Sequence, residues 1–228
     1  GIEDMGCKLR VCYFQPESRL NPEAMERYEA NILGCTRQFR YSTGNTNTID
    51  MVLSVNGIPV VALELKNQLT GQDCACAINQ YKNDRSSKEF AFRPNHRFLV
   101  YFAVDLYEVW MTTQLADGST RFMPFNQGSN GAGRSGGAGN PANPNGYVTS
   151  YLWEEVLQRD SLLDLIQRFI SNVKEKETEE KNGVVKTITK EKMLFPRYHQ
   201  YDVVRKVLAD VKQNGPGKNY LIQHSAGS

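Results

Sequence analysis

The segment at residues 47–68 constrains the fold most, because it reads as a β-hairpin with charges that an ordinary hairpin does not need. Its sequence is NTIDMVLSVNGIPVVALELKNQ, and Asn56-Gly57 is a turn dipeptide between two mostly apolar runs. One arm carries Asp50, and the other carries Glu64 and Lys66. Side chains alternate across a strand, so Glu64 and Lys66 share one face of the second arm.

The position of Asp50 depends on the register of this hairpin. A regular two-residue turn pairs Val55 with Ile58, and that register places Asp50 opposite Leu63. The carboxylate of Asp50 then lies on the face of the sheet away from the other two charged residues.

A bulged closure at residues 56–58 gives a different register. It pairs Val55 with Pro59 and places Asp50 opposite Glu64. Because Pro59 cannot donate a ladder hydrogen bond, the sequence favours this bulged register over a tight, regular closure.

In the bulged register the two carboxylates face each other across ~5 Å, where like charges repel unless a cation bridges them. Mg²⁺ prefers carboxylate and carbonyl oxygens, polarises a phosphate and lowers the pKa of a bound water. The ammonium of Lys66 then orients that water or stabilises charge on the phosphate. This combination is typical of phosphodiester hydrolysis. The alternative is a solvated sheet face, since an Asp followed by Glu-x-Lys is a common string.

Composition limits the class of protein further. The chain has 228 residues and a net charge of +2, which is too small to indicate a polyanion partner by itself. The five cysteines have no zinc-site spacing, so we expect reduced thiols in a cytoplasmic protein. No apolar run approaches the ~18 residues of a membrane helix, and the start has no signal-peptide pattern.

Turn and cap signals divide the first part of the chain into helices and strands. Asn21 and Pro22 predict the start of a helix that runs to about Leu33 and ends at Gly34. The other elements expected after the hairpin are a helix at 73–83 and strands at 98–104 and 108–113. The alternation predicts an α/β domain.

A glycine-rich stretch separates this part from the next. Half of residues 128–139 are glycine, which predicts a surface loop. A helical apolar stripe then follows at Leu152, Val156, Leu163, Ile166, Ile170 and Val173. The charge run at 174–181 is interpreted as the solvated end of that helix. A β-prone piece at 184–189 and a helix at 198–211 complete the chain as far as residue 211.

Five blocks of sequence carry a family resemblance. They are LNPEAMERYEANILGCTRQFRYS, NTIDMVLSVNGIPVVALELKNQLTGQ, FAVDLYEVWMTT, GAGNPANPNGYVTSYLWEEVL and YHQYDVVRKV. Together they resemble the N-terminal part of the R (restriction, motor) subunit of type I restriction-modification enzymes, from about Lys8 onward. The resemblance implies a PD-(D/E)xK nuclease core, which is a restriction-endonuclease-like fold with a central mixed β-sheet flanked by helices.

The resemblance also implies roles for the hairpin residues. Asp50 and Glu64 are ligands of Mg²⁺, together with the backbone carbonyl of Leu65, and Lys66 is the catalytic lysine. Ile49 stands where the named pattern has proline, a variation that leaves the chemistry intact.

A glutamine on the following helix is a further candidate. Relatives carry Gln-x-x-x-Tyr there, and Gln80 fits the glutamine, but Asp84 stands at the tyrosine position and Tyr81 adjoins the glutamine. Gln80 is therefore either a DNA or active-site residue or a residue of the helix surface. Lys82 and Arg85, with Arg93 and Arg97 after them, are either phosphate contacts or surface cations.

The C-terminal residues YLIQHSAGS resemble an apolar strand that enters a phosphate-binding loop, without the Gly-Lys-Ser/Thr that completes it. Arg197 and Gln200 resemble the adenine-reading element ahead of such a loop. With Gly227 and Ser228 they form an incomplete nucleotide site, so we expect ATP to be used only by the full-length subunit. The alternative is that the last residues are a tail without function.

The sequence thus predicts three parts: a PD-(D/E)xK nuclease domain at 1–150, a helical extension and linker at 151–192, and the truncated beginning of a RecA-like ATPase/helicase motor at 193–228. The leading hypothesis is a cytoplasmic, Mg²⁺-dependent endonuclease domain that hydrolyses double-stranded DNA after ATP-driven translocation. Its expected partners are methyltransferase and specificity subunits. The alternative is a non-catalytic docking module that joins the motor to those subunits.

Overall fold

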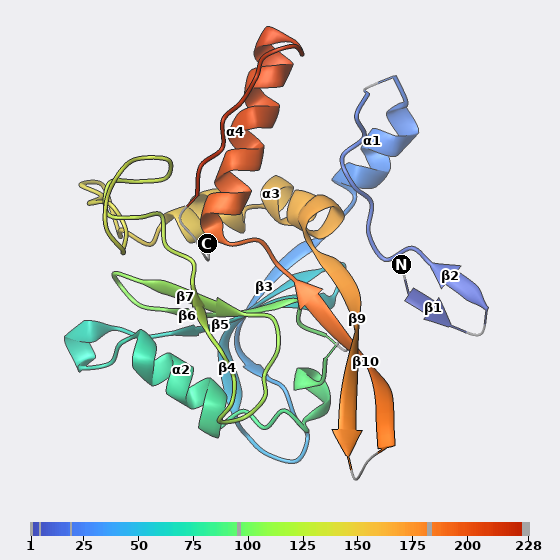
Figure 1. The fold of residues 1–228 in the computed structure, drawn as a ribbon, viewed down its shortest axis with the longest axis vertical. Helices are drawn as coiled ribbons and strands as arrows, with labels where there is room; N and C mark the ends of the chain where they lie inside the picture. Colours follow the sequence, from blue (N-terminus) through green and yellow to red (C-terminus); the bar gives the residue numbers. More distant parts are fainter. Residues whose placement is uncertain (1, 5, 19, 95–96, 182–183, 225–228) are drawn as a thin grey trace.

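A six-stranded mixed β-sheet lies at the centre of the computed structural model, with helices on both sides (Figure 1). The structure describes residues 2–4, 6–18, 20–94, 97–181 and 184–224. The strands of the sheet are β3 Leu33–Arg40, β4 Thr48–Val55, β5 Ile58–Leu65, β6 Val100–Val104, β7 Val109–Thr112 and β8 Met123–Pro124, in that order. Among the strands that the structure describes in this sheet, β5 and β6 alone pair in parallel. The predicted α/β class, with a mixed sheet flanked by helices, is confirmed.

The helices are distributed between the two faces of the sheet. They are α1 Pro22–Glu29, α2 Cys74–Asn83, α3 Arg159–Asp164 and α4 Tyr198–Asn214, with short 3₁₀ or π turns at 68–70, 90–92, 152–156 and 165–169. Figure 1 shows α2 on one side of the sheet and α3 and α4 on the other. Two separate hairpins are β1 Ile2–Asp4 with β2 Cys7–Leu9, and β9 Ser171–Lys181 with β10 Val184–Leu194.

The first helix begins where the sequence predicts, and ends earlier. The Asn21 side chain accepts a hydrogen bond from the Ala24 N–H at 3.1 Å, which is an N-cap. The predicted end at Leu33 is wrong, because Leu33 already belongs to β3. Gly34 is not a helix cap either: a Cβ there would lie 2.7 Å from Ser54 Oγ, so glycine permits the close approach of β3 to β4.

The charge run at 174–181 is a strand, and its interpretation as a helix end is wrong. The run forms β9, which pairs with β10 from Ser171 opposite Leu194 to Lys181 opposite Val184. Cross-strand charges of opposite sign support this pairing, as between Lys174 and Glu191 at 3.2 Å. The predicted helical stripe accordingly stops at Phe169, and neither the extended residue Ile170 nor the strand residue Val173 belongs to it.

Two further predictions concern segments without regular structure. The glycine-rich stretch at 128–139 has no helix or strand, as predicted, and the Gly128 N–H donates to Gly139 O at 2.8 Å. The strand expected at 220–224 is not formed. Tyr220 instead donates its hydroxyl to Asp210 of α4 at 2.6 Å, and no described strand lies beside the segment to pair with it. Gly227 and Ser228 lie outside the described residues.

The sheet separates two hydrophobic clusters. The larger lies on the side of α3 and α4 and includes Leu63 and Phe102 from the sheet. The smaller lies on the side of α2 and includes Ala62 and Tyr101 from the sheet with Tyr81 from the helix. Neighbouring residues of β5 therefore face different cores.

The described residues also bear on two expectations about the class of protein. Within the described ranges, no helix combines the length and the apolar character that crossing a bilayer demands. Four cysteines are free thiols, namely Cys12, Cys35, Cys74 and Cys76.

Candidate active site

The hairpin of β4 and β5 closes with a regular turn. Asn56 and Gly57 both have positive φ angles, 50° and 81°, and Val55 pairs directly with Ile58. The prediction of a bulge within the turn itself is therefore wrong.

A β-bulge lies one step further along, inside β5. Ser54 pairs with Pro59, but Leu53 pairs with Val61, so Val60 is the extra residue. Val60 and Val61 are consecutive, and yet both pack in the larger hydrophobic cluster. The irregularity directly follows Pro59, the residue that lacks a ladder N–H.

The bulge brings the two acidic residues opposite each other, as the sequence analysis expected. Met51 pairs with Leu63, and one further step along both strands places Asp50 opposite Glu64. The predicted register around the acidic pair is thus confirmed, although the bulge that produces it has a different position.

Asp50 sits where β4 and β5 begin to separate. The Leu65 N–H donates to Asp50 Oδ2 at 2.8 Å, so a side chain takes the place of a ladder carbonyl. The Asp50 carboxylate is thus held at the end of β5, at the residue that directly follows Glu64.

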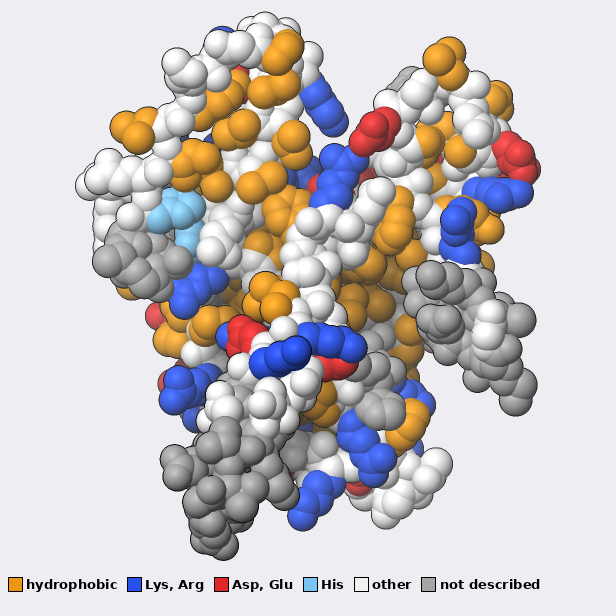
Figure 2. All heavy atoms as spheres, turned by 45° about the vertical axis from the view of Figure 1, so that its right-hand side comes forward, with side chains coloured by type: hydrophobic (Ala, Val, Ile, Leu, Met, Phe, Trp, Pro, Cys, Tyr) orange, Lys and Arg blue, Asp and Glu red, His pale blue; other side chains and the backbone are white. Residues whose placement is uncertain are grey.

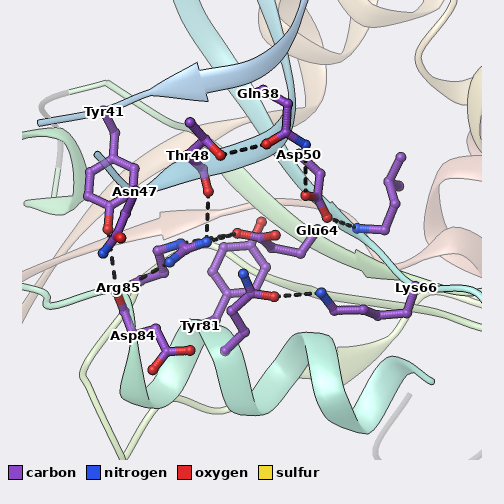
Figure 3. Close-up of polar contacts among 12 residues, drawn as sticks. Gln38, Tyr41, Asn47, Thr48, Asp50, Glu64, Lys66, Tyr81, Asp84 and Arg85 are labelled. Atoms are coloured by element: carbon purple, nitrogen blue, oxygen red, sulfur yellow. Dashed lines mark hydrogen bonds and ion pairs between the residues drawn. The ribbon is translucent and has the colours of Figure 1, made fainter. Parts of the chain in front are cut away.

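Gln38 of β3 is a site residue that the sequence analysis missed. Its Nε2 donates to Asp50 Oδ1 at 3.3 Å, and its Oε1 accepts from Thr48 Oγ1 at 2.6 Å (Figure 3). Its φ of 50° is in the left-handed region, which is strained for a residue with a side chain. Nothing in the local sequence signals this conformation.

Glu64 is the buried member of the acidic pair. Its side chain has no exposed surface, and Oε1 accepts hydrogen bonds from Arg85 Nε at 3.1 Å and Nη2 at 2.8 Å. Oε2 is buried without a hydrogen-bond partner. Burial raises the pKa of Glu64 to about 7; the attraction of Arg85 opposes this shift, and the negative charge of Asp50 adds to it.

Arg85 is not a surface cation, and that interpretation is wrong. It is 3% exposed, its guanidinium lies 5.4 Å from the centre of the Tyr41 ring, and Nη2 also donates to Thr48 O at 2.8 Å. The residue directly follows the C-cap of α2, where the chain turns back beneath the sheet. The sequence gives no sign of this burial, because Arg85 follows a polar helix end.

Lys66 is held by α2. Its Nζ donates to Gln80 Oε1 at 2.6 Å. Tyr81, which is fully buried, fixes the helix against the sheet by donating its hydroxyl to Phe102 O at 3.3 Å. Gln80 is therefore in contact with the lysine of the acidic motif, whereas Asp84, at the position where relatives have tyrosine, is exposed.

The other residues with predicted roles lie elsewhere. Lys82 is half-buried on α2. Arg197 and Gln200 form a capping box at the start of α4, in which the Arg197 N–H donates to Gln200 Oε1 at 3.0 Å. Since α4 and α2 cover different faces of the sheet, the structure does not bring this pair to the acidic residues (Figure 1).

The acidic pair fits a hard divalent cation. Within the described ranges no three His, Cys, Asp or Glu residues form a metal-binding group, so the side-chain ligands are two carboxylates at most. Mg²⁺ sites commonly use one or two carboxylates and keep several waters. The buried Oε2 of Glu64, which has no donor, is the observation that favours a cation beside it.

Comparison with known proteins shows a family similarity for part of the chain. Residues 20–120 match the family model described as the type I restriction enzyme R protein N terminus (HSDR_N). The matched segment, which is less than half of the chain, is similar to the N-terminal region of these R proteins. No curated protein and no solved structure gives a significant match. The matched segment spans β3 to β7 with α1 and α2, so it contains every residue of the site described above.

Proposed function

We propose that the matched segment is a Mg²⁺-dependent endonuclease domain that hydrolyses phosphodiester bonds of double-stranded DNA. One observation carries the proposal: the bulge in β5 places Asp50 opposite a Glu64 whose buried Oε2 has no partner. Lys66 directly follows β5, and its ammonium bonds to Gln80 of α2, the helix on the Glu64 side of the sheet. The arrangement lies within the segment that matches the restriction family.

Each residue has a defined part in this proposal. Asp50, Glu64 and the Leu65 carbonyl would hold the ion, which when bound polarises the phosphate and lowers the pKa of a water. Lys66, kept in place by Gln80, provides a fixed positive charge for an oxygen of the scissile phosphate. Gln38 holds Asp50 from the edge strand.

We also infer the surroundings of this domain from the family resemblance. The mixed sheet is the restriction-endonuclease-like core, residues 151–192 extend it, and residues from Met193 onward begin a RecA-like motor. Hydrophobic side chains on α4 and just after it are exposed (Figure 2), as expected for a helix that packs against other parts of a complete motor. They are Val204, Leu208, Leu221 and Ile222. The full-length subunit then uses ATP, with methyltransferase and specificity subunits as its partners in the cytoplasm.

A non-catalytic docking module is the second candidate. The observation in its favour is the Arg85–Glu64 ion pair, because buried ion pairs also occur as purely structural features of cores. In that case the acidic pair binds no metal, and the domain serves only to join the motor to its partner subunits.

The test is a Lys66→Ala replacement in the R subunit reconstituted with its partner subunits. We expect DNA cleavage to fall by about 10²- to 10³-fold, because a fixed charge at the reacting phosphate is lost. ATP hydrolysis should be unchanged. The control is Lys88→Ala, which removes an exposed lysine of the same region. Normal cleavage by the Lys66 variant contradicts the nuclease assignment, and loss of complex assembly by a subunit whose acidic pair binds no metal favours docking.

A further inference from the structure

We propose that Arg85 is a positioning residue that decides which oxygen of Glu64 is available to the cation. The inference rests on the proposed function, since it concerns the same metal site. It goes beyond that function by assigning a role in the site to a residue outside the acidic motif.

The contacts of Arg85 are concentrated on one oxygen. Both Nε and Nη2 donate to Glu64 Oε1, at 3.1 and 2.8 Å. An arginine that pairs with a carboxylate usually donates one N–H to each oxygen. Here the fork closes on a single oxygen, and Oε2 is left buried without a donor. Arg85 therefore fixes the carboxylate in an orientation that presents Oε2.

Arg85 is itself fixed by contacts that do not involve Glu64. Nη2 donates to Thr48 O at 2.8 Å, Nη1 donates to Asp84 O at 3.4 Å, and the guanidinium lies over the Tyr41 ring. Figure 3 shows the guanidinium and Asp50 on different sides of the Glu64 carboxylate. The arginine is thus anchored in β4, in the end of α2 and in the smaller core, away from the side that Asp50 shares.

Two roles for this arginine predict effects of opposite sign. If Arg85 competed with the metal for Glu64, its removal would strengthen metal binding, because a positive charge near the site would be gone. If Arg85 positions Glu64, its removal releases the carboxylate and weakens metal binding. If Arg85 competed with the metal, its guanidinium would have to move away from Glu64 when the metal binds. Arg85 is only 3% exposed and donates to two backbone carbonyls, and these contacts hold it in place, which favours the positioning role.

The experiment measures Mn²⁺ affinity of the full R subunit by calorimetric titration. Arg85→Met should weaken Mn²⁺ binding by about 10- to 100-fold, as removal of partners that orient a metal ligand usually does. Arg85→Lys keeps the charge but loses the fork, so its affinity should lie between those of Arg85→Met and the wild type. Arg93→Met is the matched control, because Arg93 is exposed and donates Nε to the Lys88 carbonyl at 3.0 Å, away from the acidic pair. The Mn²⁺ affinity of Arg93→Met should equal that of the wild type.

The outcomes of these titrations test the positioning role of Arg85 and the proposed metal site separately. Unchanged or tighter Mn²⁺ binding by folded Arg85→Met, with folding checked by near-ultraviolet circular dichroism in EDTA, overturns the positioning role. If Arg85→Met does not fold, Arg85→Lys decides, and wild-type affinity in that variant overturns the role. Asp50→Asn separates this failure from failure of the proposed function. When Asp50→Asn abolishes binding but the Arg85 variants do not weaken it, only the positioning role is wrong. When the wild type binds no Mn²⁺, the proposed function is wrong and the positioning role is overturned with it.

Discussion

The two faces of β5 show how differently one strand uses its buried positions. Leu63 faces the larger cluster, where it packs with apolar side chains only. Glu64, its neighbour, faces the side of α2 and is even more deeply buried, at 0% against 5% exposed. Burial of Leu63 stabilises the fold directly, whereas burial of a carboxylate costs free energy unless the charge is paired.

The difference originates in the bulge at Val60. By adding one residue, it directs Val60 and Val61 to the same cluster and sets the face on which Glu64 lies relative to Asp50. One face of the strand therefore serves stability, and the other carries a charge that stability alone does not explain. The predictions below test this division, beginning with the largest expected change.

The apolar face should respond to mutation as a core. Phe102→Ala removes a fully buried ring whose centre lies 5.4 Å from the centre of the Phe125 ring. We expect the free energy of unfolding to fall by about 3–5 kcal/mol. Urea denaturation measures the change. Leu69→Ala is the control, since that side chain is 87% exposed and its loss should have little effect. A small loss for Phe102→Ala would contradict the description of this face as the main source of stability.

The charged face should respond to pH. Burial raises the pKa of Glu64 in the folded protein to about 7, whereas the unfolded carboxyl ionises near its ordinary value of 4.5. Its contribution to stability is therefore complete below about pH 4.5 and is lost as pH rises to about 7. In EDTA this loss should amount to about 3 kcal/mol.

Glu64→Gln isolates that contribution. The groups that face Glu64 are Asp50 and Arg85, with Tyr81 beside them, and all are kept in this variant. Between pH 4.5 and 7.5 the free energy of unfolding of the wild type should fall by about 3 kcal/mol relative to that of Glu64→Gln, which has no carboxyl to titrate at this position. Urea denaturation of both proteins measures this difference. Parallel curves would show that the raised pKa does not belong to Glu64.

The smallest expected effect concerns the edge of the site. Gln38→Gly relieves the left-handed strain, and Gln38→Ala keeps it, while both lose the bond to Asp50. The glycine variant should be more stable than the alanine variant by about 1 kcal/mol. At Arg37, whose φ is not positive, the Arg37→Gly variant should be less stable than the Arg37→Ala variant by about 0.5–1 kcal/mol. The same order at both positions would mean that Gln38 is not strained.

The sequence predicted those parts of the molecule that depend on local signals. The turn at Asn56-Gly57, the cap at Asn21 and the apolar run of β6 each have a short-range cause, and each is found. The opposition of Asp50 and Glu64 was also predictable, because Pro59 indicates an irregular ladder.

The remaining features depend on contacts between distant segments. Arg85 is buried because Glu64 and Thr48 receive it from strands that precede it by 21 and 37 residues. The run at 174–181 becomes a strand because β10 pairs with it, although its composition resembles a solvated helix end. Gly34 ends no helix because it pairs with Ser54 of β4, whose Oγ leaves no room for a side chain at Gly34. Patterns within one segment contain none of this information.

The most direct test of the central claim is the position of a bound ion. Crystals of the R subunit region soaked in near-millimolar Mn²⁺ should show anomalous scattering between Asp50 and Oε2 of Glu64, with Oε1 still bonded to Arg85. An ion at that place supports a nuclease face on β5. Crystals that bind no Mn²⁺ between the two carboxylates, at a concentration that fills ordinary carboxylate sites, would contradict it.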